Sequence, residues 1–228
     1  MAEETETDGG VLTGTSGKEV AEQRLREEIA RGELAPGQRL VEAELGQRYA
    51  VTRNSARMAL DALASDGLVE RVPNRGARVR TVSAAEAVAI MECRMVLDGL
   101  VARKAAENAT PVQSRRLEKN LQRMRQAVSA GDLLGYSELI QDQHELVRQI
   151  AGHDVAAALI DRLQAQIVRH QFRLSLRPGR AQQSLRELEK VVAAIVAHEP
   201  ARAESVARAH VQGVIAAVLD HPGATRPH

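Results

Sequence analysis

The sequence has almost no aromatic residues: one Phe, two Tyr and no Trp in 228 residues. Proteins that bind single-stranded nucleic acid by stacking exposed bases need aromatic platforms, so the composition argues against that class. A single cysteine, Cys93, excludes an internal disulfide framework and a cysteine-rich zinc module. Because Cys93 stands in a segment with helical periodicity, we expect it to be a small buried hydrophobic residue.

Long hydrophobic runs are also missing, since no stretch approaches the roughly 18 apolar residues of a membrane-spanning helix. The first ten residues, MAEETETDGG, are acidic, whereas a secretory signal peptide begins with a basic stretch and continues with an apolar one. We therefore expect a cytoplasmic protein without a membrane partner. Hydrophobic residues make up 44% of the chain, which is ample for one large core or two smaller ones.

The net charge of +1 conceals an uneven distribution of charged residues. Residues 1–17 contain four acidic residues and no basic one, and we predict a disordered acidic tail there. Residues 46–80 contain seven arginines and three acidic residues, the sharpest short basic excess in the chain. A local basic excess of this kind is typical of a surface that contacts nucleic acid.

Residues 18–80 show the order helix, turn, helix, short turn, helix and hairpin. The first helix follows a helical spacing of apolar residues that stops at Gly32. The stretch EAELGQRYAVTRNSARMALDALASDGL then predicts two helices with a break near residues 50–52. The stretch LVERVPNRGARVRTV predicts a β-hairpin around PNRG. This order is that of a winged helix-turn-helix.

Two arginines of the third helix, Arg53 and Arg57, stand four residues apart after Thr52, which suits the N-cap position. Taken alone, they could form a solvated basic face in which Arg57 pairs with Asp61. The preceding helix, the arginine-rich hairpin and the local basic excess favour DNA instead. The planar guanidinium group matches the edge of guanine in the major groove.

Other residues near these arginines extend the predicted DNA contact. Asn54 and Ser55 lie on the first helical turn and suit contacts to base edges or phosphates. At the tip of the hairpin, Gly76 allows the backbone to approach DNA closely while Arg75 enters a minor groove.

From Ala84 onward the chain predicts helices only, at about 84–109, 111–130, 132–151, 154–176, 180–198 and 200–220. The predicted fold class is therefore mainly α, with an N-terminal winged helix-turn-helix and a small β-hairpin followed by an all-helical bundle. We place a linker at 81–85, an effector-binding and dimerisation domain at 86–220, and a flexible tail at 221–228.

Residues 18–80 resemble the DNA-binding domain of GntR-family transcriptional regulators. The resemblance is carried by the joint order and spacing of short pieces, among them Pro36-Gly37, Val51-Thr52-Arg53, Arg57, Gly67-Leu68-Val69 and Arg75-Gly76. It implies that Thr52, Arg53, Arg57 and Gly76 contact operator DNA. Gly46 departs from the family, which usually has alanine at that position.

The helical half resembles the FadR-type (FCD) subgroup of that family in CRMVLDGLVARKAAENAT, HELVRQIAGHDVAAALIDRL and SLRELEKVVAAIVAHEPARAESVARAHV. The resemblance implies a homodimer that binds a small-molecule effector, such as an organic acid. Many members hold a divalent metal with one Asp and three His. Here His144 and His210 match two of the four ligands, whereas Ile140 and Leu188 replace the others. We therefore predict no metal site and keep a divalent metal as the weaker alternative.

The roles of the polar residues in this half have two interpretations each. His144 and His210 are either satisfied core histidines or part of an effector pocket, and their match to the subgroup favours the pocket. Arg94 and Asp98 stand four residues apart on one helix, so they form either an effector contact or a structural ion pair.

The sequence as a whole predicts a DNA-binding transcriptional regulator, an effector-responsive repressor that binds a short palindromic operator as a dimer. The alternative is a DNA-binding dimer whose helical domain binds no effector and has an architectural or adaptor role. An enzyme is disfavoured, because the sequence contains no complete metal set, nucleophile elbow or phosphate loop.

Overall fold

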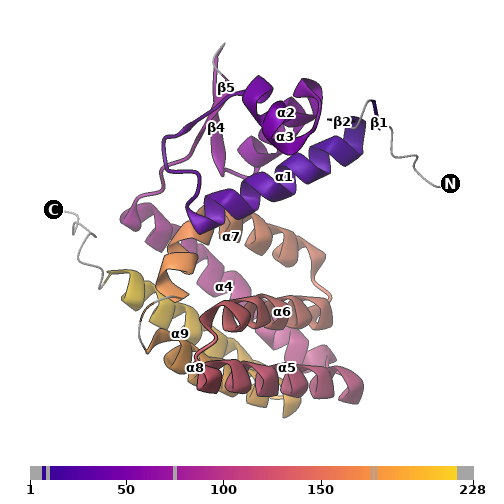
Figure 1. Cartoon of the computed structure of the whole chain (residues 1–228). Helices are drawn as coiled ribbons and strands as arrows, with labels where there is room; N and C mark the ends of the chain where they lie inside the picture. Colours follow the sequence, from indigo (N-terminus) through magenta and orange to yellow (C-terminus); the bar gives the residue numbers. More distant parts are fainter. Residues whose placement is uncertain (1–6, 9–10, 74–75, 176, 178, 220–228) are drawn as a thin grey trace. The chain divides into compact units, whose positions relative to one another are not determined.

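The computed structural model describes residues 7–8, 11–73, 76–175, 177 and 179–219, in two compact units, Met1–Val82 and Ser83–His228 (Figure 1). The N-terminal unit contains α1 (Gly14–Arg31), α2 (Glu42–Tyr49) and α3 (Arg53–Ser65), with β3 (Arg39–Leu40), β4 (Val69–Val72) and β5 (Gly76–Val79). The three strands form an antiparallel sheet in the order β3-β5-β4. The predicted winged helix-turn-helix is confirmed.

The core of this unit forms where α1 packs against α3. Leu25 of α1 and Leu60 and Leu63 of α3 are fully buried, at positions that recur with helical spacing in both segments. Their burial leaves the opposite side of α3 outside the core, and that side carries Arg53 and Arg57.

The start of the chain differs from the predicted tail. Strands β1 (Thr7–Asp8) and β2 (Val11–Leu12) pair antiparallel, and α1 begins at Gly14. Leu12 also forms a parallel bridge with Val51. The structure therefore differs from the predicted disordered segment at residues 7–8 and 11–17, which form β1, β2 and the start of α1. Leu12 is held by backbone hydrogen bonds to Ala50 and Thr52 in the loop before α3. Residues 1–6 and 9–10 lie outside the described residues.

The second unit is helical throughout its described residues, as predicted. It contains α4 (Ala84–Asn108), α5 (Pro111–Ala130), α6 (Leu133–Ala151), α7 (Asp154–Ser175), α8 (Arg180–Val196) and α9 (Pro200–Leu219). Ser83, Thr110 and Asp132 cap α4, α5 and α6, because their side-chain oxygens accept hydrogen bonds from backbone N–H groups of the first turn. Helix α4 is central, since it packs against α6, α7, α8 and α9, while α5 lies beside α6 (Figure 1).

Three further predictions concern the edges and surface of this unit. The division between the units falls between Val82 and Ser83. The predicted tail, residues 221–228, lies outside the described residues. Cys93 is exposed and not buried as expected, because it lies on an outward side of α4 with Ala89 and Val96. In the described part of the chain, no helix is both long and apolar enough to cross a membrane.

Candidate functional site

The N-terminus of α3 is formed as the sequence predicts. Thr52 adopts an extended conformation, and its Oγ1 accepts a hydrogen bond from the backbone N–H of Ser55 at 3.1 Å. This N-cap satisfies one backbone donor, while the helix dipole keeps the end of α3 favourable for an anion. Arg53 is the first residue of α3, and Arg57 follows one turn later.

The N-terminal half of the exposed face of α3 consists of Arg53, Asn54, Arg57 and Met58. The Arg53 side chain is 77% exposed. Arg57 donates a hydrogen bond from Nη2 to Asn54 Oδ1 at 2.7 Å. The alternative pairing of Arg57 with Asp61 is not found, because the Asp61 carboxylate lies 3.0 Å from Arg71 Nε.

Glu42, the first residue of α2, orients two arginines beside this face. Its carboxylate lies 3.4 Å from Arg53 Nε and 3.2 Å from Arg71 Nη2. Glu42 is itself well shielded from solvent, whereas Arg53 is not. Sequence reasoning did not identify Glu42, because the contact joins residues eleven and twenty-nine positions apart.

Ser55 does not belong to the exposed surface, although the sequence predicts it as a DNA contact. Its side chain is fully buried, and Oγ donates to the carbonyl oxygen of Gly14 at 3.2 Å. Its position on α3 faces α1, so the side chain cannot reach a base or phosphate. Met58 lies on the exposed face instead, four residues after Asn54, a spacing that could have identified it. Its apolar side chain suits a thymine methyl group.

The glycine of the hairpin has a structural role inside the sheet. Gly76 has φ +83, and a Cβ there would lie 2.5 Å from the carbonyl oxygen of Leu40. Both the left-handed conformation and the close approach of β3 therefore require glycine. Arg75, the other predicted contact in the hairpin, lies outside the described residues, so only Gly76 can be placed.

In the second unit, four helices bring charged and imidazole side chains together in what we call the histidine cluster. Its members are Arg94 and Asp98 of α4, His144 and Arg148 of α6, Arg180 and Glu187 of α8, and His210 of α9. The ring centroids of His144 and His210 lie 6.1 Å apart. All four residues predicted for the effector site therefore belong to one cluster.

Two buried nitrogen atoms of this cluster lack hydrogen-bond partners among the described residues: Arg94 Nε and His144 Nδ1. Arg94 is only 6% exposed, and its Nη2 lies 3.1 Å from the carboxylate of Asp98. Buried polar atoms without partners are rare because each loses its hydration without compensation. Both nitrogens therefore keep hydrogen-bonding capacity that the described side chains do not use.

An ion pair that sequence reasoning missed forms the other side of the cluster. The Glu187 carboxylate lies 2.8 Å from His210 Nδ1 and 3.3 Å from Arg180 Nη2. Burial raises the pKa of Glu187, but the hydrogen bond with His210 and the charge of Arg180 lower it by more, so it lies below its usual value. The contact with His210 joins α8 to α9, whereas Arg180 lies on α8 itself, seven residues before Glu187.

Comparison with known proteins identifies the family. The family model "FCD domain" matches residues 89–213, which is more than half of the chain. The family model "Bacterial regulatory proteins, gntR family" matches residues 18–79. The chain belongs to the GntR family, in the group with an FCD domain. The family expected from the sequence is confirmed.

Similar GntR-type proteins include curated relatives and solved structures. The chain is 34% identical over 148 residues to the HTH-type transcriptional repressor RspR of Escherichia coli strain K12, and the match covers 65% of either chain, under two thirds of RspR. It is 27% identical over 209 residues to the HTH-type transcriptional regulator LutR of Bacillus subtilis strain 168, covering 82% of this chain and 94% of LutR. Escherichia coli McbR/YncC shares the fold, with TM-score 0.77 at 20% identity over 90% of this chain and 98% of that one.

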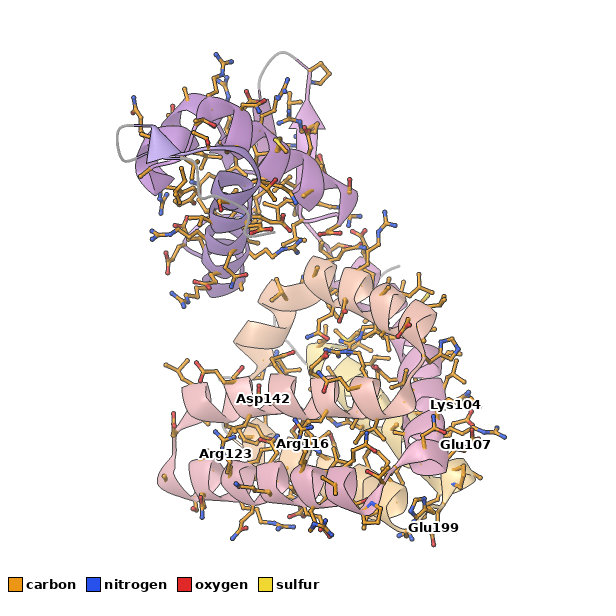
Figure 2. All side chains as sticks on the ribbon, turned by 90° about the vertical axis from the view of Figure 1, so that its right-hand side faces the viewer. Lys104, Glu107, Arg116, Arg123, Asp142 and Glu199 are labelled. Atoms are coloured by element: carbon orange, nitrogen blue, oxygen red, sulfur yellow. The ribbon has the colours of Figure 1, made fainter. Side chains whose placement is uncertain are left out.

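The divalent metal that the FCD resemblance implies does not fit the residues present. Leu188 is buried, Ile140 packs against the hydrophobic core, and His210 Nδ1 is engaged by Glu187. Across the described part of the chain, no three His, Cys, Asp or Glu side chains converge as metal ligands. Asp142 is exposed on α6 and does not replace the missing carboxylate (Figure 2). Two imidazoles alone make a poor site for a divalent ion.

We expect the stability of the FCD domain to depend on pH because of the shifted pKa of His144. Burial, and then electrostatic interactions with His210, Arg94 and Arg148, lower the pKa of His144 well below its ordinary value of 6.5. The unfolded chain therefore binds a proton near pH 6.5 that the folded domain does not bind. Above pH 6.5 His144 is neutral in both states and does not reduce the free energy of unfolding. As the pH falls from 6.5 toward the folded-state pKa, the free energy of unfolding decreases by up to about 1.4 kcal/mol per pH unit.

Denaturant unfolding of the wild type and of His144→Gln between pH 7.5 and pH 5 measures this dependence. The glutamine is neutral throughout, so the variant should lose less stability over the acid half of the range. Equal losses in the two proteins would contradict the assignment of this slope to His144.

Proposed function

We propose that this GntR-family protein is a transcriptional repressor that binds a short palindromic operator as a homodimer. The observation that carries the proposal is the exposed face of α3, where Arg53, Asn54 and Arg57 follow a capped helix N-terminus. An arginine fork can donate two hydrogen bonds to guanine O6 and N7, and asparagine can pair with adenine in the same groove. The name of RspR, a transcriptional repressor, supports the sign of regulation.

The contact between Glu42 and Arg53 fits this proposal, because a DNA base can replace Glu42 as the partner of the arginine. In the free protein Glu42 balances the charge of Arg53 and Arg71. Because Arg53 is exposed and only one nitrogen approaches Glu42, its Nη atoms remain available for a base edge. Glu42 thus holds Arg53 close to the orientation that binds a base. Little binding free energy is lost when the side chain moves from Glu42 to DNA.

The dimer is supported by an outward surface of α4. Ala89, Cys93 and Val96 follow one another at helical spacing and are exposed, with Val96 50% accessible. A second copy of the chain would cover these side chains. Two DNA-binding units in such a dimer would meet two half-sites of a palindrome, one helical turn of DNA or a multiple of it apart.

We further propose that the histidine cluster binds the effector, a small carboxylate, without a metal ion. Arg94 Nε supplies a donor without a protein partner, and the neutral His144 ring supplies a donor or acceptor at Nδ1 according to its tautomer. A carboxylate that pairs with Arg94 forms a charge-assisted hydrogen bond in a buried setting, where such bonds are strong. The effector regulates only if it binds the operator-free state more tightly.

A thermal-shift survey of small carboxylates with the whole protein in excess chelator tests this effector class. We expect at least one to raise the melting temperature, because a ligand present at 100 times its Kd stabilises by about 2.7 kcal/mol. The same compound should weaken operator binding. If none stabilises the protein, the dimer without an effector is the better account. If stabilisation appears only when a divalent metal is restored, the metal-free site is wrong.

A further inference from the structure

We infer that residues 11–17 and Ser55 form an N-terminal clamp that positions α3 for reading DNA. Residues 11–17 precede the GntR match, which begins at residue 18. The inference rests on the DNA-contacting face proposed above and adds positioning residues that do not themselves touch DNA. Three separate contacts carry it.

The first contact joins Leu12 to the loop before α3. The backbone N–H of Leu12 donates to the carbonyl oxygen of Ala50 at 2.9 Å, and the carbonyl oxygen of Leu12 accepts from the N–H of Thr52 at 3.0 Å. Thr52 is the N-cap of α3 and stands directly before Arg53. Leu12 therefore fixes the residue from which the DNA-contacting face begins.

The second contact joins the start of α3 to the start of α1. Thr52 Oγ1 donates to Ser55 Oγ at 2.9 Å, and Ser55 Oγ donates in turn to the carbonyl oxygen of Gly14 at 3.2 Å. The Ser55 side chain is fully buried, so water does not compete for these hydrogen bonds. The N-cap of α3 is thereby tied to the first residue of α1.

The third contact is the close approach that Gly17 allows. A Cβ at this position would lie 2.6 Å from the carbonyl oxygen of Leu12 and 2.8 Å from Ser55 Oγ. Glycine inside a helix lowers stability by about 1 kcal/mol relative to alanine, so α1 would favour alanine here on propensity alone. The space is needed because Leu12 and Ser55 both pack against this residue.

The clamp acts on specificity because base contacts depend on geometry more strictly than phosphate contacts do. Arg53 and Arg57 leave the first turns of α3, so a shift of its N-terminus moves both guanidinium groups. Bidentate pairing with a base tolerates little displacement, whereas attraction to phosphates follows the net charge of the surface. Loosening the clamp should therefore weaken operator binding and leave binding to unrelated DNA nearly unchanged.

The test uses the full chain and two DNA duplexes. The specific duplex is one that the wild type selects from a random-sequence pool, and the control duplex is a scrambled version of it. We expect Gly17→Ala to bind the specific duplex about ten-fold more weakly, the effect of one lost base contact, and to bind the scrambled duplex within about two-fold of wild type. Gln23→Ala, an exposed and uncharged change on the same helix, should change neither affinity.

Ser55→Ala provides a second variant that keeps the N-cap, because Thr52 accepts from the backbone N–H of residue 55. It removes the link to Gly14 and should lower specific affinity about five-fold, the equivalent of one net hydrogen bond. Unchanged specific binding in both variants, or equal losses on both duplexes, would overturn the clamp. Arg53→Ala tests the contact face separately, so either proposal can fail without the other.

Discussion

The double variant Arg53→Ala, Arg57→Ala is expected to lose at least about 30-fold in operator affinity. Each bidentate arginine–guanine contact contributes about 1–3 kcal/mol of discrimination, and the variant removes both candidates for such a contact. The backbone of α3 should be unaffected, because both side chains are exposed and the cap at Thr52 remains. Fluorescence anisotropy with a selected operator duplex measures the loss.

A control must separate base contact from loss of positive charge. Arg116→Ala, Arg123→Ala removes two exposed arginines from α5, in the other unit (Figure 2). This variant carries the same change in net charge and should bind the operator within about two-fold of wild type, since no contact to DNA is removed. If the two double variants lost affinity equally, α3 would contribute charge only, and its role in reading bases would be refuted.

Arg94→Gln is expected to lower the affinity for a stabilising carboxylate by about 100-fold. A buried, charge-assisted hydrogen bond to a ligand is worth roughly 2–5 kcal/mol when one partner is removed. The expected observation is a melting temperature that no longer rises with the carboxylate at concentrations that saturate the wild type. Operator binding without the carboxylate should remain, because Arg94 belongs to the FCD domain.

Helix α4 supplies a matched control for this variant. Arg103 and Glu107 form an i,i+4 ion pair like that of Arg94 and Asp98, but the Arg103 side chain is exposed. Arg103→Gln should therefore leave the carboxylate response intact. A response that survives in Arg94→Gln would move the effector site away from the histidine cluster.

The sequence was sufficient for those parts of the DNA-binding face that depend on local structure. The cap at Thr52 and the outward direction of Arg53 and Arg57 follow from one helix and its period. Ser55 stands four residues before Ala59 on the buried side of α3, so the helical period also indicates its burial. Only its partner Gly14, forty-one residues earlier in the chain, does not follow from the local pattern. The same tertiary contact explains why the sequence alone predicts a disordered tail over residues 11–17.

The histidine cluster shows a similar division. Resemblance to the FCD subgroup placed His144 and His210 together, and the structure brings their rings to 6.1 Å. Glu187 does not follow from the sequence pattern, because its partner His210 meets it only after α8 and α9 pack. The period of α4 left the direction of Cys93 open, since its buried and exposed sides both contain apolar residues.

The central claim is that side chains on the exposed face of α3 read base pairs, and selection from a random-sequence pool tests it most directly. The pools selected by wild type and by Arg53→Ala are sequenced and compared. We predict that the wild type selects a palindrome with a preferred guanine in each half-site, and that the variant loses this preference at one symmetric pair of positions while keeping the rest. The same palindrome with the same base preferences from the variant would contradict the account.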